Sequence, residues 1–92
     1  MIINIRQVIY CNNTENIDNY IAVDKTCKCD IVPRIGESIY NYMWSDNVET
    51  KVVEVIYDLD KGCCDIYLEP RTTPLSKERI VEIANLHEWE VE

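Results

Sequence analysis

The sequence predicts an α+β protein that is mostly β, a small antiparallel barrel or bent sheet of five to six strands with one C-terminal helix. Short runs of alternating apolar and polar residues, separated by turn-forming residues, recur from residue 2 to residue 69 and indicate strands that bury one face. After residue 74, apolar residues recur at the spacing of an amphipathic helix. The chain of 92 residues suffices for one hydrophobic core, so we expect a single domain over residues 1–92.

The N-terminal half of the chain is expected to form strands at residues 2–11, 20–23, 26–32 and 38–44. In the first strand an apolar face of isoleucine and cysteine residues is interrupted by Gln7. Residues 12–19 are rich in turn-forming residues and predict a loop. Asp24 and Lys25 predict a turn between the second and third strands.

A turn is also expected before residue 38, because Pro33 fixes φ and Gly36 permits a positive φ. The segment Pro33-Arg34-Ile35-Gly36-Glu37 opens the strand that follows it. This segment resembles a turn common in SH3-like barrels. The resemblance covers about ten residues and implies an SH3-like form of the small barrel.

The next two strands, at residues 51–57 and 63–69, predict a hairpin with a four-residue loop at residues 59–62. This loop length pairs Tyr57 with Cys64, Val55 with Ile66 and Val53 with Leu68, so that all apolar residues of the hairpin meet on one face. Gly62 then takes the loop position that needs a positive φ.

The C-terminal segment predicts a helix over about residues 75–87, with Thr73 as its N-cap and Pro74 in the first turn. Its outer face carries the acidic residues Glu78 and Glu82. His87 lacks an obvious acid–base partner and is expected to be a packed or capping residue. Trp89 and Val91 alternate with glutamates and predict an edge strand that returns to the sheet.

The charge balance of 9 basic and 17 acidic side chains, a net charge of −8, disfavours direct binding to nucleic acid and favours a partner with a basic surface. Residues 1–6 lack the basic and continuous apolar regions of a signal peptide, and no apolar run approaches the about 20 residues that span a bilayer. We therefore expect a cytoplasmic protein without membrane contact. The isoleucine-rich and asparagine-rich composition is favoured by AT-rich coding and is typical of low-GC bacteria and their phages.

Five cysteines, Cys11, Cys27, Cys29, Cys63 and Cys64, occur without the paired spacing of a structural zinc site. Cys63 and Cys64 are adjacent and would point to opposite faces of a strand. Alternation alone places Cys27 and Cys29 on one face, as small buried apolar residues. We therefore expect reduced core cysteines, no metal and no cofactor, and weigh a metal site or redox chemistry as the alternatives.

Other chemical signatures are weak. Asp58, Asp60, Gly62 and Glu69 approach the calcium-loop pattern of EF-hands, but the glycine stands one place early and the flanking residues predict strands. No phosphate-binding glycine loop or nucleophile motif is present. The sequence therefore predicts a protein that is not an enzyme.

The aromatic residues Tyr40, Tyr42 and Trp44 share one face of the strand expected at residues 38–44. On a solvated face they would form a patch of the kind that anchors a protein partner. On a buried face they would belong to the core, with Asn41 and Met43 outside. The sequence leaves both alternatives open.

We interpret the chain as a small acidic protein-binding domain, with Tyr40, Tyr42, Trp44, Glu78 and Glu82 as its candidate binding residues. Its size and composition suit a phage or mobile-element accessory protein that blocks a host factor. The alternative is a β-barrel that sequesters a small ligand or nucleotide, as a homo-oligomer with sites between chains. A metal-binding domain that uses the thiolates is a third interpretation.

Overall fold

The computed structural model describes residues 1–14, 17–40, 43–44 and 49–92. Within these residues the elements are, in chain order, β1 (Ile2–Tyr10), the 3₁₀ helix η1 (Ile17–Asn19), β2 (Tyr20–Lys28), β3 (Ser38–Ile39), β4 (Thr50–Asp58), β5 (Cys63–Leu68), β6 (Arg71–Thr72), α1 (Lys77–Leu86) and β7 (Glu90–Val91). These described strands form one sheet in the order β3-β4-β5-β1-β2-β7, and β6 lies beside β1 beyond the end of β5.

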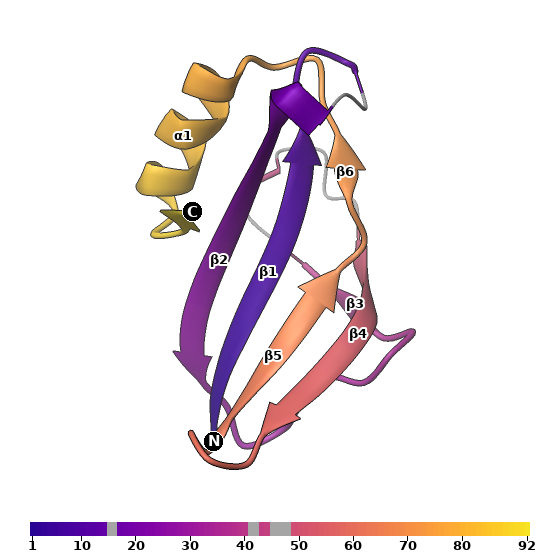
Figure 1. Cartoon of the computed structure of the whole chain (residues 1–92), viewed down its shortest axis with the longest axis vertical. Coiled ribbons are helices and arrows are strands. Elements are labelled where there is room, and N and C mark those ends of the chain that lie inside the picture. Colours follow the sequence, from indigo (N-terminus) through magenta and orange to yellow (C-terminus); the bar gives the residue numbers. More distant parts are fainter. Residues whose placement is uncertain (15–16, 41–42, 45–48) are drawn as a thin grey trace.

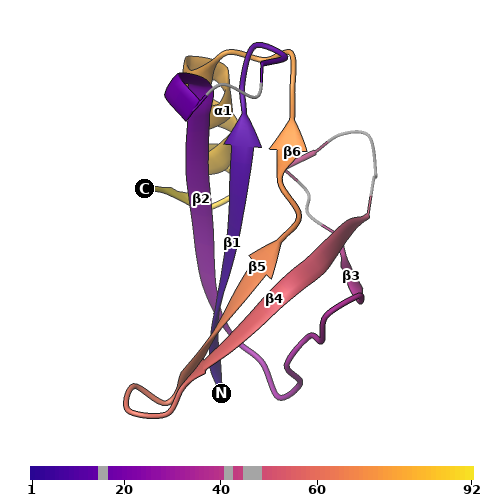
Figure 2. The same ribbon diagram turned by 45° about the vertical axis from the view of Figure 1, so that its right-hand side comes forward.

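The sheet curls into a half-barrel, and α1 lies beside the upper part of β2 (Figure 1). Figure 2 shows the twist between β4 and the central strands. The prediction of a mostly β fold with one C-terminal helix is thus confirmed. No helix in the described part of the chain is long and apolar enough to cross a membrane.

The expectation of a purely antiparallel sheet is wrong, because β1 pairs with β5 in parallel, from Ile2 opposite Cys63 to Arg6 opposite Tyr67. On its other side β1 pairs with β2 in the expected antiparallel way. Parallel neighbours need a long connection between them. Here the connection includes β2, β3 and β4, which complete the sheet on both sides of the β1–β5 pair.

The concave face of the sheet holds the core, and β1 supplies its centre with the alternation that the sequence predicts. Ile3, Ile9 and the polar Gln7 are all fully or almost fully buried. The helix adds Ile80 and Ala84 to this core. Trp44 and Trp89 also pack into it, together with Met43 from the same short segment as Trp44.

One continuous strand, β2, joins the strand predicted at residues 20–23 to the start of the one predicted at 26–32, so the predicted turn at Asp24 and Lys25 is wrong. The strand ends at Lys28, so residues 29–32 do not belong to it as predicted. Both residues keep their pairing with β1. The ammonium group of Lys25 lies 5.8 Å from the centre of the Trp89 ring and donates a hydrogen bond to the carbonyl of His87. These contacts to the C-terminal segment hold Lys25 within the strand.

The β4–β5 hairpin has the predicted four-residue loop, and the pairings of Val55 with Ile66 and of Tyr57 with Cys64 are confirmed. Gly62 has the expected positive φ, +65°. The pairing of Val53 with Leu68 is wrong, because a β-bulge lies between Val52 and Glu54 and places Val52 opposite Leu68. A bulge inserts one extra residue and reverses the alternation beyond it. Val52 is therefore buried and Val53 is exposed.

The strand predicted at residues 38–44 ends at Ile39, and residues 41–42 lie outside the described part of the chain. Met43 and Trp44 are both buried, which strict strand alternation would not allow. These two consecutive residues therefore enter the core from a segment that is not a strand.

The helix begins later than predicted, because its N-cap is Ser76 and not Thr73. The Ser76 hydroxyl accepts a hydrogen bond from the Arg79 amide, whereas the Thr73 hydroxyl accepts one from the Leu75 amide in the preceding turn. His87 is the C-cap residue, as expected. The predicted edge strand at the C-terminus is confirmed as β7, which pairs with β2.

Candidate functional site

A break between β5 and β6 creates a recess with a polar lining. Both strands pair with β1 in parallel. Between the two paired stretches, however, this segment contains one residue more than β1 does, at the position of Glu69 and Pro70. Proline has no amide hydrogen to donate to a neighbouring strand. The Gln7 side chain fills the gap and donates its amide hydrogen to the Glu69 carbonyl, at 3.1 Å. This bond explains why the apolar face of β1 contains a glutamine.

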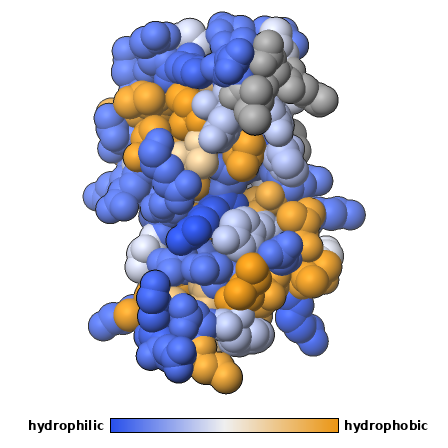
Figure 3. All heavy atoms as spheres, in the orientation of Figure 1, coloured by the Kyte–Doolittle hydropathy of each residue, from blue (hydrophilic) through white to orange (hydrophobic). Residues whose placement is uncertain are grey.

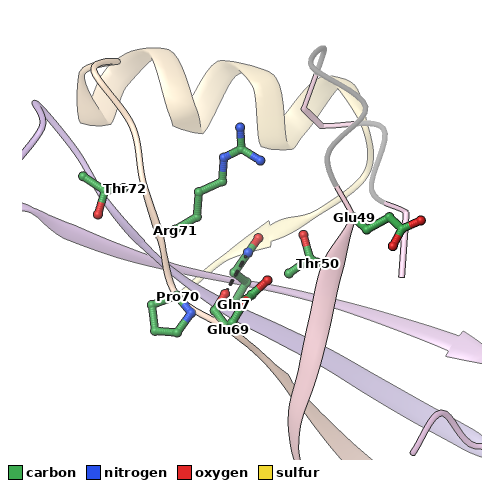
Figure 4. Close-up of a pocket in the computed structure, with 7 residues that line it drawn as sticks. All are labelled: Gln7, Glu49, Thr50, Glu69, Pro70, Arg71 and Thr72. Carbon is green, nitrogen blue, oxygen red and sulfur yellow. Dashed lines mark hydrogen bonds between the residues drawn. The ribbon is translucent and has the colours of Figure 1, made fainter. Parts of the chain in front are cut away.

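The recess is a pocket of about 280 Å³ lined by Gln7, Glu49, Thr50, Glu69, Pro70, Arg71 and Thr72. In Figure 4 the side chains of Gln7, Glu69 and Thr50 gather on one side, and Arg71 extends its guanidinium group on the other. The Glu69 carboxylate accepts a hydrogen bond from the Lys51 amide, which fixes one acidic group of the lining. The pocket is therefore polar and contains both signs of charge.

Trp44 contacts two of the residues that line this pocket. Its indole N–H donates to the Gln7 side-chain oxygen at 3.4 Å, and the Arg71 guanidinium lies 4.1 Å from the centre of its ring. A cation over an indole ring is attracted by the ring's quadrupole. Nearby, the Tyr40 hydroxyl donates to the Glu49 carboxylate at 3.2 Å, and this hydrogen bond raises the pKa of Tyr40.

The chemistry open to this pocket is limited. Gln7 uses both ends of its amide in hydrogen bonds, so it holds the fold together at this point. Ligand pockets in proteins are mostly apolar and usually have volumes of about 300–1,000 Å³. A polar recess of about 280 Å³ could hold only a small polar molecule. Among the described residues, no group of three or more histidines, cysteines or carboxylates could hold a metal ion.

The second candidate site is the outer edge of β4. Only the start of β4 pairs with β3, through Thr50 and Lys51, and no other described strand covers the edge of residues 53–58. The exposed apolar side chains on this strand and its following loop are Val53, Ile56, Tyr57 and Leu59. Figure 3 shows hydrophobic residues gathered at the lower right, over the region where β4 lies in Figure 1.

A shallow groove adjoins this edge on the concave side of the sheet. It has a volume of about 360 Å³ and is lined by Pro33, Arg34, Ile35, Val55 and Tyr57. Tyr57 is 56% exposed and Ile35 is 66% exposed, although both are large apolar side chains. Exposed apolar side chains on an unpaired strand edge are a feature that monomeric proteins usually avoid. We call the edge of residues 53–58 and this groove the β4 surface.

The candidate binding residues from the sequence do not form one surface. Trp44 is 6% exposed, so the core alternative holds for it. Tyr40 is exposed, and Tyr42 lies outside the described residues. Glu78 and Glu82 are exposed on α1, where Glu82 forms an ion pair of 2.9 Å with Arg79. A binding role for these residues stays a prediction.

Sequence reasoning missed both Gln7 and the β4 surface. The signal for Gln7 was one polar residue in an otherwise apolar strand face. The β4 surface was missed because the hairpin prediction placed Val53, Val55 and Tyr57 together on the core face. The bulge after Val52 removes Val53 from that face.

The cysteines fall into two environments. Cys11 and Cys64 are buried in the core, as the sequence predicts, and burial raises the pKa of each thiol. Cys27, Cys29 and Cys63 are only half-buried, so the expectation of buried core cysteines does not hold in full for them. All five cysteines are free thiols. Burial, followed by the contact with Cys29, raises the pKa of Cys27.

Comparison with protein-family models, with curated proteins and with solved structures finds no match to this chain, so function has to be argued from its own residues.

Proposed function

We propose that this chain is a non-enzymatic protein-binding domain that adds an extended segment of a partner protein to the open edge of β4. The observation that carries the proposal is the edge of residues 53–58, which has no covering strand in the described structure and carries exposed apolar side chains. The backbone of such an edge supplies hydrogen bonds to an added strand, and its side chains supply selectivity. A small accessory protein could block a host factor in this way.

The charges on β4 argue against a second copy of this chain as the partner. Glu54, Ile56 and Asp58 lie on the same face of β4 by strand alternation. When a strand pairs with its own copy in antiparallel fashion, two residues lie opposite each other only if both point their backbone N–H and C=O groups toward the other strand, or both point them away from it. In every such pairing whose centre lies between residues 54 and 58, the carboxylate of Glu54 or Asp58 in one copy lies directly or diagonally opposite a carboxylate of the other copy. Like charges in these positions destabilise a strand pair.

The same arrangement favours a basic partner segment. A strand with lysine or arginine opposite Glu54 and Asp58 would have its two basic residues four positions apart. Apolar residues between them would face Ile56 on one side and the groove beside Val55 and Tyr57 on the other. The chain's net charge of −8 would add a long-range attraction that salt weakens.

A pair of short synthetic peptides tests this proposal. One carries two lysines four positions apart with apolar residues between them, and the other has glutamates in place of the lysines. We expect only the lysine peptide to bind, and its binding should shift the backbone NMR signals of residues 53–58. Its affinity should fall as the salt concentration is raised. In the double variant Glu54→Lys/Asp58→Lys we expect the preference to reverse, since the attraction then acts on the glutamate peptide.

The matched control is Glu78→Lys/Glu82→Lys, which makes the same charge change on α1. This variant should keep the preference for the lysine peptide. Equal binding of both peptides, or NMR shifts centred on α1 instead of β4, would contradict strand addition at β4. Circular dichroism of each variant establishes that the fold is retained.

A second candidate function is the binding of a small polar ligand in the pocket beside Gln7. The observation that favours it is the enclosure of about 280 Å³ between Arg71 and the Glu69 carboxylate, two groups of opposite charge. Native mass spectrometry of the purified chain tests it. A stoichiometric small molecule that is lost in Arg71→Gln would support this function, and the mass of the chain alone would argue against it.

A further inference from the structure

Two thiols lie side by side where β2 ends. Cys27 is the penultimate residue of β2, and Cys29 directly follows the strand. The two side chains lie on the same face because they are two positions apart. Their Sγ atoms are 3.9 Å apart, and both side chains are half-buried. Solvent-borne ions can therefore reach a pair of sulfur atoms that the backbone already holds together.

A third sulfur atom belongs to the residue opposite this pair. The Cys29 amide donates to the Met1 carbonyl at 3.0 Å, so Met1 continues the β1–β2 register and lies opposite Cys29. Directly opposite residues in antiparallel strands project to the same face. Met1 is 56% exposed, so its flexible thioether has room to turn toward the two thiols.

The separation of the two thiols matches two ligands of a tetrahedral or trigonal metal ion better than it matches a disulfide. With metal–sulfur bonds of about 2.3 Å, two sulfur ligands are about 3.8 Å apart at a tetrahedral ion, about 4.0 Å at a trigonal ion and about 4.6 Å at a linear ion. The observed 3.9 Å lies between the first two values. A disulfide would require the sulfur atoms to close to about 2.05 Å.

The donor set decides which ion fits. Structural zinc takes four ligands, and within the described residues no histidine, carboxylate or further cysteine joins this pair into a larger cluster. Thiolate and thioether sulfur together select Cu(I). A thiol that coordinates a metal ion loses its proton outright, so the ion would be held by two thiolates and one thioether.

We propose that Cys27, Cys29 and Met1 form a binding site for one Cu(I) ion at the lower end of the half-barrel. The site is independent of strand addition at β4, because none of its three residues belongs to the β4 surface. Binding involves no change of oxidation state: Cu(I) replaces the two thiol protons, which pass to solvent.

The test is an anaerobic titration of the fully reduced protein with Cu(I) in the presence of a chromophoric Cu(I) chelator. We expect one Cu(I) per chain to be withdrawn from the chelator. Cys27→Ser and Cys29→Ser should each weaken binding by at least about 100-fold, because loss of a supporting contact alone costs up to about that much in metal sites. The matched control, Cys63→Ser, removes a half-buried cysteine elsewhere and should leave the affinity within about threefold.

X-ray absorption at the copper edge supplies a measurement that does not depend on variants. We expect only sulfur ligands, at about 2.3 Å, with a coordination number near three. Equal affinity of wild type and Cys27→Ser, or an equal loss in Cys63→Ser, would overturn the assignment. Nitrogen or oxygen ligands at the copper, or stoichiometric zinc that Cu(I) does not displace, would overturn it as well.

Discussion

Replacing Gln7 by methionine tests the account of the break between β5 and β6. The Gln7 side chain is 2% exposed and bonds to the Glu69 carbonyl at 3.1 Å and to the Trp44 indole N–H at 3.4 Å. Methionine has a similar length and no amide group, so Gln7→Met keeps most of the packing and removes both bonds. The indole N–H then stays in the interior without this partner, and the carbonyl of the half-buried Glu69 loses its bond as well.

The two bonds are not equivalent. A buried polar group that loses its partner costs about 1–3 kcal/mol. The 3.1 Å bond to Glu69 lies in the normal range for N–H···O, whereas the 3.4 Å bond to Trp44 is longer than usual. We therefore expect Gln7→Met to lower the free energy of unfolding by about 2 kcal/mol and Trp44→Phe by about 1 kcal/mol. The double variant should cost less than the sum by about 0.5 kcal/mol.

Urea unfolding followed by circular dichroism measures these differences. Ile9→Val, at a fully buried position of the same strand, is the packing control and should cost about 1 kcal/mol. Gln7→Met would refute the reasoning if its free energy of unfolding equalled or exceeded that of wild type. Such a result would mean that the Glu69 carbonyl does not depend on Gln7, and that the break in the strand is stable without it.

Two further predictions concern the ends of the sheet. The hydrogen bond with Asp24, then burial, raises the pKa of Glu92, so its contribution to stability is lost as pH rises above a glutamate's ordinary 4.5. Glu92→Gln should therefore gain stability relative to wild type between acidic and neutral pH in unfolding measurements, and a constant difference would contradict this. Gly62→Ala should lower the free energy of unfolding by about 1 kcal/mol because of its positive φ, with no steric term since a Cβ there meets nothing within 4 Å. A neutral Gly62→Ala would show that the loop changes conformation.

The local structure of the chain could largely be predicted from alternation and turn chemistry. β1 has its predicted buried face, and the β4–β5 loop has its predicted length and its glycine at a positive φ. These features depend on residues that are close in sequence. The return of the C-terminus as β7 could also be predicted, because Trp89 alternates with exposed glutamates and needs burial.

The features that failed depend on contacts between distant segments. Nothing in the residues of β1 and β5 indicates that they pair in parallel, since both strands have the alternation typical of antiparallel sheets. The continuity of β2 depends on Lys25 meeting Trp89 and His87, which follow it by more than sixty residues. The bulge after Val52 is specified by its pairing with the end of β5 and not by a turn residue.

The candidate site could be predicted only in part, because burial of the aromatic residues is a tertiary property. The sequence allows Trp44 to lie either in the core or on the surface, and its burial against Gln7 and Arg71 decides for the core. Glu78 and Glu82 on α1 carry the charge that the sequence indicates, but the exposed apolar side chains of the β4 surface belong to another part of the sheet. The sequence indicates which residues are charged and which are apolar. It does not indicate that the charged residues of α1 and the exposed apolar residues of β4 lie apart in the fold.

The two irregularities of the sheet face each other and divide the molecule into unlike halves. The β4 bulge lies beside the β5–β6 break, where Glu69 and Lys51 are joined by a backbone hydrogen bond of 2.9 Å. Bulges bend a sheet and increase its twist. In Figure 1 the helix lies above this level, beside the upper part of β2. Below it, Tyr57 stays exposed although its partner Cys64 is fully buried.

The lower half of the sheet, where the described structure leaves the edge of β4 partly uncovered, is therefore where we expect binding by this chain. It contains the open edge of β4 and, at the end of β2, the pair of Cys27 and Cys29. A domain that used its sheet only as support for a closed core would cover Val55 and Tyr57 as it covers Ile66. Because exposed apolar area on a strand edge promotes aggregation unless it has a partner, we infer that the edge of β4 is kept open for one.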